Sequence, residues 1–160
     1  KITLLMSLML CSYAYAGDAS FEVNIDLPSK SGQYHNPYVA IWIEDSSGQS
    51  VRTLALWRER AKWLKDIRRW WRKVGRKDQA LVDASTSATR AAGQYSLTFD
   101  GLDDKGAPIA NGNYFLRVEV VREKGGRTIS KQAITIDGQP HAYPLAATAE
   151  LNKSMFKINY

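Results

Sequence analysis

Hydrophobic and polar side chains alternate along much of the chain, and this alternation defines the predicted strands. From Phe21 to Leu27, apolar residues take every second position and Glu, Asn and Asp lie between them. A period of two is typical of a strand with one buried face. Similar runs between turn residues predict further strands at Tyr38–Ile43, Val51–Leu56, Tyr95–Phe99, Tyr114–Val121 and Thr128–Ile136.

The turns between these runs favour short antiparallel connections. Asp45-Ser46-Ser47-Gly48 separates one pair of strands, and Gly125-Gly126 separates another. We expect one more strand at Tyr143 to Leu145 or at Met155 to Ile158. The pattern therefore predicts an all-β fold, an Ig-like β-sandwich of about seven strands.

One segment departs from the strand period and predicts a helix over about residues 58–74. Its apolar residues fall at helical spacing, and its basic residues take the opposite face. The apolar face consists of Trp63, Leu64, Ile67, Trp70, Trp71 and Val74. The basic face consists of Lys62, Lys65, Arg68, Arg69, Arg72 and Lys73. We interpret the segment as one amphipathic helix inserted into the sandwich, with Gly75 as its end and a linker rich in Ala, Ser and Thr after it.

The first sixteen residues have the pattern of a secretory signal peptide. A basic residue precedes a short apolar run, and small residues stand at Ala14 and Ala16. The run is too short to span a membrane, which takes about 20 residues. We expect cleavage after Ala16, export to the periplasm, and a single domain over residues 17–160.

Composition excludes several classes of site. The only cysteine lies in the expected signal peptide, so a disulfide, a c-type haem site or a thiolate metal cluster is not expected in the mature chain. His35 and His141 are the only histidines, which argues against a histidine-rich metal site and a catalytic triad. No acid–base constellation stands out. An electron-transfer or binding protein is therefore favoured over an independent enzyme.

Positive charge is concentrated in the helical segment. The chain has 22 Lys or Arg and 16 Asp or Glu residues. Ten of the basic residues, but only the acids Glu59 and Asp66, lie between Arg58 and Lys77. Such a surface suits an anionic membrane or an acidic membrane redox protein. The exported address argues against nucleic acid.

Two resemblances support this architecture. The first covers about thirty residues and is to the Ig-like domain of flagellar hook-capping proteins, through Phe99-Asp100-Gly101, Asp103-Asp104, Gly106, Pro108 and Gly112 to Arg117. The second covers nearly the whole mature chain and is to the predicted periplasmic proteins of domain-of-unknown-function family 2271. It rests on Tyr34-His35, Pro37 to Asp45, Val51 to Leu54 and Arg69-Trp70-Trp71.

The segment Asp83-Ala84-Ser85-Thr86-Ser87-Ala88-Thr89 resembles the site that FAD:protein FMN transferases modify. That pattern is Asp, two free positions, Ser or Thr, Gly or Ser, Ala, and then Ser or Thr. Asp83, Thr86, Ser87, Ala88 and Thr89 match all five constrained positions. The resemblance implies FMN bonded through a phosphoester to the Thr89 hydroxyl, with small neighbours that fit a transferase cleft and Asp83 fixing the local turn.

Several side chains are candidates to surround such a flavin. Trp57, Trp63, Trp70 and Trp71 lie upstream of the motif and could cover the ring, while Arg69, Arg72 or Lys73 could stabilise its negative charge. Tryptophans at helical spacing are also typical of packing against the sandwich, and a basic face is often simply solvated. His35 could approach the flavin or could complete a turn before Pro37.

Two functions follow as expectations. The first is a periplasmic flavoprotein electron carrier with FMN on Thr89, which takes electrons from a membrane reductase, of the PepSY type that the family resemblance implies. The alternative is a binding or assembly module without a cofactor, whose basic, Trp-rich helix binds a membrane or protein partner. In that case the motif is an ordinary Ser/Thr-rich loop after a helix.

Overall fold

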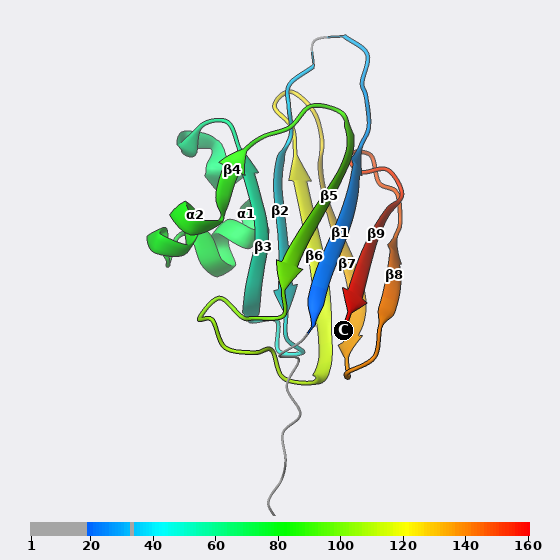
Figure 1. The fold of residues 1–160 in the computed structure, drawn as a ribbon. Coiled ribbons are helices and arrows are strands. Elements are labelled where there is room, and N and C mark those ends of the chain that lie inside the picture. The colour runs from blue at the N-terminus through cyan, green and yellow to red at the C-terminus, as the bar shows by residue number, and fades with distance from the viewer. Residues whose placement is uncertain (1–18, 33) are drawn as a thin grey trace, which may run out of the picture.

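A computed structural model describes residues 19–32 and 34–160, so the expected signal peptide lies outside the described residues. These residues form a sandwich of two sheets (Figure 1). One sheet has the order β5-β1-β9-β8 and the other the order β4-β3-β2-β6-β7. The strands are β1 Ser20–Leu27, β2 Tyr38–Glu44, β3 Ser50–Arg58, β4 Thr86–Ala88, β5 Gly93–Asp100, β6 Gly112–Val121, β7 Arg127–Ile136, β8 His141–Leu145 and β9 Ser154–Asn159.

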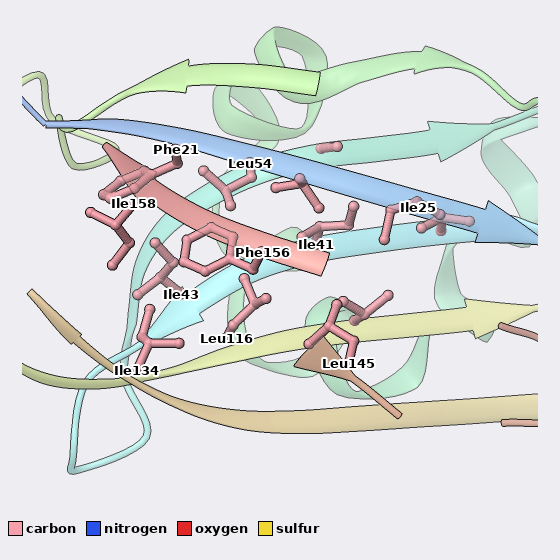
Figure 2. Close-up of a cluster of buried hydrophobic side chains, with 14 of the residues drawn as sticks. Phe21, Ile25, Ile41, Ile43, Leu54, Leu116, Ile134, Leu145, Phe156 and Ile158 are labelled. Carbon is pink, nitrogen blue, oxygen red and sulfur yellow. The ribbon is translucent and has the colours of Figure 1, made fainter. Parts of the chain in front are cut away.

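The predicted all-β sandwich is confirmed, and its interior follows from the alternation in the sequence. In β1, every second side chain is buried, and the residues between them are half-buried. Side chains from both sheets meet between them, among them Phe21, Ile41, Leu116 and Phe156 (Figure 2). Burial of these apolar side chains supplies the main stabilisation of the sandwich.

The strand count exceeds the prediction of about seven, because the described residues form nine strands. Both candidate positions near the C-terminus are strands, β8 and β9, and they pair with each other. The other strand that was not predicted is β4, which lies at the edge of its sheet and pairs with β3 in parallel. The other strand pairs are antiparallel. The three residues of β4 are polar or small and carry no strand period.

The helical insertion is confirmed, but it is not one continuous helix. It consists of a 3₁₀ helix η1 Ala61–Asp66, a short helix α1 Arg68–Trp70 and a π-helical turn η2 Trp71–Gly75. The break falls at Ile67, whose ψ of 71° is not helical. A further helix, α2 Gln79–Ser85, begins at the cap residue Asp78 in the region expected to continue as linker.

The insertion covers the outer face of the β4-β3-β2-β6-β7 sheet and forms a second apolar cluster with it. Because this sheet is covered on both faces, all seven residues of β2 are buried. The cluster consists of Tyr38, Ala40, Trp42, Leu56, Leu64, Ile67, Trp70, Val74 and Val82. Among the described residues, none of the helices is long and apolar enough to cross a membrane.

Candidate functional site

Thr89 lies directly after β4, at one end of the five-stranded sheet. Its backbone N–H donates to the carbonyl of Arg58 at 3.0 Å, and its hydroxyl donates to the carbonyl of Pro37. The side chain is half-buried. The same end of the sheet carries the start of β2 and the β6–β7 turn, uppermost in Figure 1. Thr89 is therefore hydrogen-bonded both to the end of β3 and to the segment that precedes β2.

Helix α2 leads into β4 and positions the rest of the motif. Asp78 caps the helix by accepting the Leu81 N–H at 2.9 Å, and Val82 anchors it in the second cluster. The Thr86 hydroxyl donates to the carbonyl of Val82 at the helix end. This geometry satisfies a carbonyl that the helix itself leaves without a donor.

The remaining motif residues are exposed. Ser87 and Ala88 present their side chains to solvent from the sheet edge. Asp83 is also exposed, and its carboxylate accepts from the Gln79 amide at 2.9 Å, one turn earlier on the same helix. Within the part of the chain that the structure describes, the Asp83 side chain makes this hydrogen bond and none to the turn expected from the sequence. Small exposed residues directly before Thr89 leave this edge accessible to another protein.

Arg69 and Trp70 attach the insertion to the sheet. Trp70 is 0% exposed, and its indole N–H donates to the Thr53 hydroxyl at 3.2 Å. The backbone N–H groups of Arg69 and Trp70 donate to the buried carboxylate of Glu119 at 3.1 and 3.0 Å. Trp70 has no exposed surface that could cover a flavin ring, so its position agrees with the packing interpretation.

A second buried carboxylate, Glu44, completes this attachment. Its oxygens accept from the Arg69 guanidinium at 2.8 Å, from Arg117 at 2.9 Å and from the Trp42 indole at 3.0 Å. Burial opposes ionisation, but the hydrogen bonds from Arg69, Trp42 and Arg117 outweigh it and hold the pKa of Glu44 below its ordinary value of 4.5. The Arg69 side chain is thus engaged in an ion pair with the fold.

The side chain of Lys73 reaches toward the opposite end of the sheet from Thr89, and Trp71 and Arg72 directly precede it in η2. The Lys73 ammonium donates to the carbonyl of Gly48, in the β2–β3 turn, at 2.8 Å. Strand β2, with seven residues, separates that turn from the Thr89 end by about 20 Å. Trp71 is half-buried, and the exposed Arg72 donates to the carbonyl of Arg68 at 3.1 Å. The structure does not bring these three residues to Thr89.

His35 and Trp63, in contrast, lie at the Thr89 end. They share a cavity of about 310 Å³ with Tyr38, Glu59 and Arg60. Trp63 is 39% exposed, although its sequence spacing puts it on the same helical face as the buried Trp70. Sequence periodicity could not separate the two, and the only hint was that Trp63 follows a run of charged residues. Trp63 is thus an exposed aromatic side chain of the insertion at the Thr89 end of the sheet.

The family comparison agrees with the second of the resemblances. No curated protein and no solved structure gives a significant match to the chain. The Ig-like character of the sandwich therefore remains a prediction. A family model described as "Predicted periplasmic protein (DUF2271)" matches residues 20–153. Since this match covers most of the chain, the protein belongs to that family of predicted periplasmic proteins.

Proposed function

We propose that the protein is a periplasmic electron carrier with FMN joined to Thr89 through a phosphoester. The observation that carries the proposal is the complete modification motif, displayed at an accessible sheet edge in a protein of a periplasmic family. FMN accepts and releases electrons at its isoalloxazine ring, and a covalent tether prevents its loss from the compartment. The protein then needs no substrate pocket of its own.

The attachment is a transfer of FMN from FAD. The Thr89 oxygen attacks the phosphorus on the FMN side of the FAD pyrophosphate, and the bond from that phosphorus to the bridging oxygen breaks. AMP leaves, and the hydroxyl proton passes to a base of the transferase. Catalysis of such a transfer rests on positioning the hydroxyl in line with the leaving oxygen. The protein contributes only the acceptor hydroxyl and a segment whose small side chains allow it to fit the transferase cleft.

Modification requires Thr89 to leave its hydrogen bonds for a short time. Strand β4 has three residues, lies at the sheet edge and is bonded to β3 alone. Short edge elements open locally at a small fraction of the cost of global unfolding. We infer that β4 detaches as a unit, that the transferase binds the extended segment, and that β4 returns to β3 after modification.

The partner in electron transfer is proposed to be a membrane reductase, of the PepSY type that the family resemblance implies. Exposed basic side chains on the insertion provide positive charge for docking against an acidic partner or a membrane surface. They are Arg60, Lys62, Lys65, Arg68, Arg72, Arg76 and Lys77. A flavin at the Thr89 end would lie beside part of this charge, since Arg60 and Lys62 line the cavity described above.

Co-export with an FMN transferase tests the attachment. We expect the purified protein to keep a flavin absorption spectrum after denaturation, and Thr89→Ala to abolish it. Ser85→Ala is the matched control, because it removes a hydroxyl at a free position of the motif and should leave the spectrum unchanged. A colourless wild-type protein, beside a known substrate that is modified in the same cells, would reject the proposal.

The alternative function, a cofactor-free binding module, is favoured by one observation. Three of the exposed basic residues named above, Arg60, Lys62 and Arg68, line cavities together with the exposed Trp63, and this combination suits anionic lipid headgroups. Co-sedimentation of the Thr89→Ala protein with vesicles of anionic and of zwitterionic lipid tests this alternative. Salt-sensitive binding to the anionic vesicles alone would support it, and no binding to either kind of vesicle would reject it.

A further inference from the structure

The Thr89 end of the sheet carries a groove on the outer face, between η1 and the β6–β7 turn. It consists of two adjoining cavities of about 310 and 370 Å³, which share Tyr38, Trp63 and Glu123. Sites for small molecules and cofactors typically enclose about 300–1,000 Å³. We call these two cavities the Trp63 groove.

The groove begins at the residues that hold Thr89. His35, which lines it, lies two positions before Pro37, whose carbonyl accepts the Thr89 hydroxyl. Glu59, which also lines it, directly follows Arg58, whose carbonyl accepts the Thr89 N–H. The groove therefore begins within two residues of both hydrogen-bond partners of Thr89, which is within reach of a phosphate and a ribityl chain attached there.

The lining of the groove is suited to an aromatic group with negative charge. Trp63 offers an exposed indole face, with the Lys62 ammonium 4.8 Å from its centroid. Six basic side chains line the two cavities, and two of them, Arg122 and Arg127, are paired with the buried carboxylates of Glu150 and Glu119. The other four, Arg60, Lys62, Arg68 and Lys124, outnumber the lining acids Glu59, Asp66 and Glu123. Stacking on indole and net positive charge together favour a flavin over a neutral aliphatic ligand.

One polar atom at the start of the groove lacks a partner. The buried Nε2 of His35 makes no hydrogen bond within the described part of the chain, while Nδ1 lies 3.8 Å from the carboxylate of Glu123. An unsatisfied buried ring nitrogen costs free energy. A phosphate or ribityl oxygen of a tethered FMN would supply the missing acceptor or donor. The residues present thus fit the cofactor that the motif implies.

We propose that the Trp63 groove holds the isoalloxazine ring of FMN attached to Thr89, with Trp63 stacked on the ring. This inference rests on the proposed attachment at Thr89. Of the four tryptophans that the sequence suggested, it selects Trp63, which is exposed at the Thr89 end of the sheet. Arg68 faces the second cavity and raises the reduction potential, because its charge stabilises the reduced, anionic flavin.

A larger cavity of about 780 Å³ on the other sheet is the competing position. It is lined by parts of β1, β5, β8 and β9, and Lys153 and Asp26 are its charged residues. It has neither an exposed indole nor an excess of positive charge. A ring in that cavity would be insensitive to substitutions in the Trp63 groove, which makes the two positions distinguishable.

Fluorescence of the covalently bound flavin tests the position of the ring in the intact, modified protein. Indole stacking quenches flavin emission, so we expect weak emission from the folded wild type and a several-fold increase on unfolding in urea. Trp63→Leu should raise the emission of the folded protein to nearly that of the unfolded one. Trp71→Leu is the matched control, since it removes a tryptophan from the same insertion outside the groove, and should leave emission low.

The midpoint potential provides a second readout. Arg68→Gln should make the potential of the bound flavin more negative, whereas Arg72→Gln, one helical turn away and outside the groove, should change it less. Emission that Trp63→Leu does not raise, or equal potentials for the two arginine variants, would overturn the groove assignment while the adduct at Thr89 stands. Absence of any adduct in the wild type would overturn the attachment, and this assignment with it.

Discussion

The molecule has two apolar regions of different construction. Between the sheets, the core contains aliphatic and aromatic side chains contributed by strands from both sides. Under the insertion, the second cluster contains two of the largest buried side chains, Trp42 and Trp70, and lies beside the buried carboxylates Glu44 and Glu119. The first region consists of apolar side chains packed between hydrogen-bonded strands, whereas the second also depends on buried carboxylates that bind the insertion to the sheet.

This difference determines how each region behaves as a scaffold. Apolar packing tolerates changes of side chain that conserve volume. A buried carboxylate that accepts from backbone N–H groups and arginines fixes direction as well as distance. Glu44 and Glu119 therefore set the orientation of the insertion on the sheet. This orientation leaves Trp70 buried and Trp63 exposed at the Thr89 end of the sheet.

The largest effect is expected from Glu119→Ala. Glu119 accepts from the N–H groups of Arg69 and Trp70 and from the Arg127 guanidinium. Its removal leaves these donors without an acceptor and should lower the free energy of unfolding by about 3–5 kcal/mol. Urea unfolding measures the loss. Glu123→Ala, at an exposed position in the following turn, is the control, and an equal loss for both variants would contradict the role of Glu119.

A smaller effect is expected where the insertion ends, from Gly75→Ala. A Cβ at this position would lie 2.5 Å from the Trp71 ring and 2.7 Å from the Trp70 ring. Because these rings are rigid, the helical turn must shift, which should cost about 1–3 kcal/mol. Thermal unfolding measures the cost. Gly106→Ala is not a suitable control, because Gly106 has a φ of +81° and a side chain there would strain the backbone. A Gly75→Ala protein as stable as the wild type would show that the turn adapts freely.

The stability of the second region should depend on pH through the buried carboxylate of Glu44. Since the pKa of Glu44 is lowered in the folded state, its contribution is full above its ordinary value of 4.5 and is lost as the pH falls through the folded-state pKa. The stability difference between wild type and Glu44→Gln should therefore be largest near neutral pH and shrink in acid. Urea unfolding between about pH 3 and pH 7 measures it. A difference independent of pH would contradict the prediction.

The smallest effect is expected from Trp63→Ala. Its indole is 39% exposed, so its removal should change stability by no more than about 0.5 kcal/mol. Trp70→Ala, in the same insertion, removes a fully buried ring and should cost about 3–5 kcal/mol. Parallel urea titrations compare the two. Equal costs would mean that Trp63 also serves mainly to pack the fold.

The sequence predicts the inter-sheet core well because period-two alternation is a local signal. It predicts the second region poorly because that region depends on distant pairs. The break at Ile67 depends on Glu119, about fifty positions later, whose carboxylate accepts from the N–H groups of Arg69 and Trp70. Glu119 itself appears on the polar face of an alternating strand, so the pattern places it in solvent.

In the candidate site, too, local patterns were predictable from the sequence, whereas features that depend on distant contacts were not. The motif from Asp83 to Thr89 is a local pattern and was found directly. Strand β4 was missed because three polar or small residues have no period, and its pairing with β3 depends on the sheet edge. Trp63 and Trp70 have equivalent spacing, and only the docked structure distinguishes the exposed ring from the buried one.

The most direct test of the account is the site of modification in protein co-exported with an FMN transferase. Trypsin should release residues 78–90, which contain Ser85, Thr86, Ser87 and Thr89, as one peptide. Fragmentation by mass spectrometry then locates any FMN phosphoester among these hydroxyls. We predict a single adduct on Thr89, retained in Thr89→Ser and absent in Thr89→Ala. An adduct on another residue, or an unmodified peptide beside a control substrate that is modified in the same cells, would contradict the account.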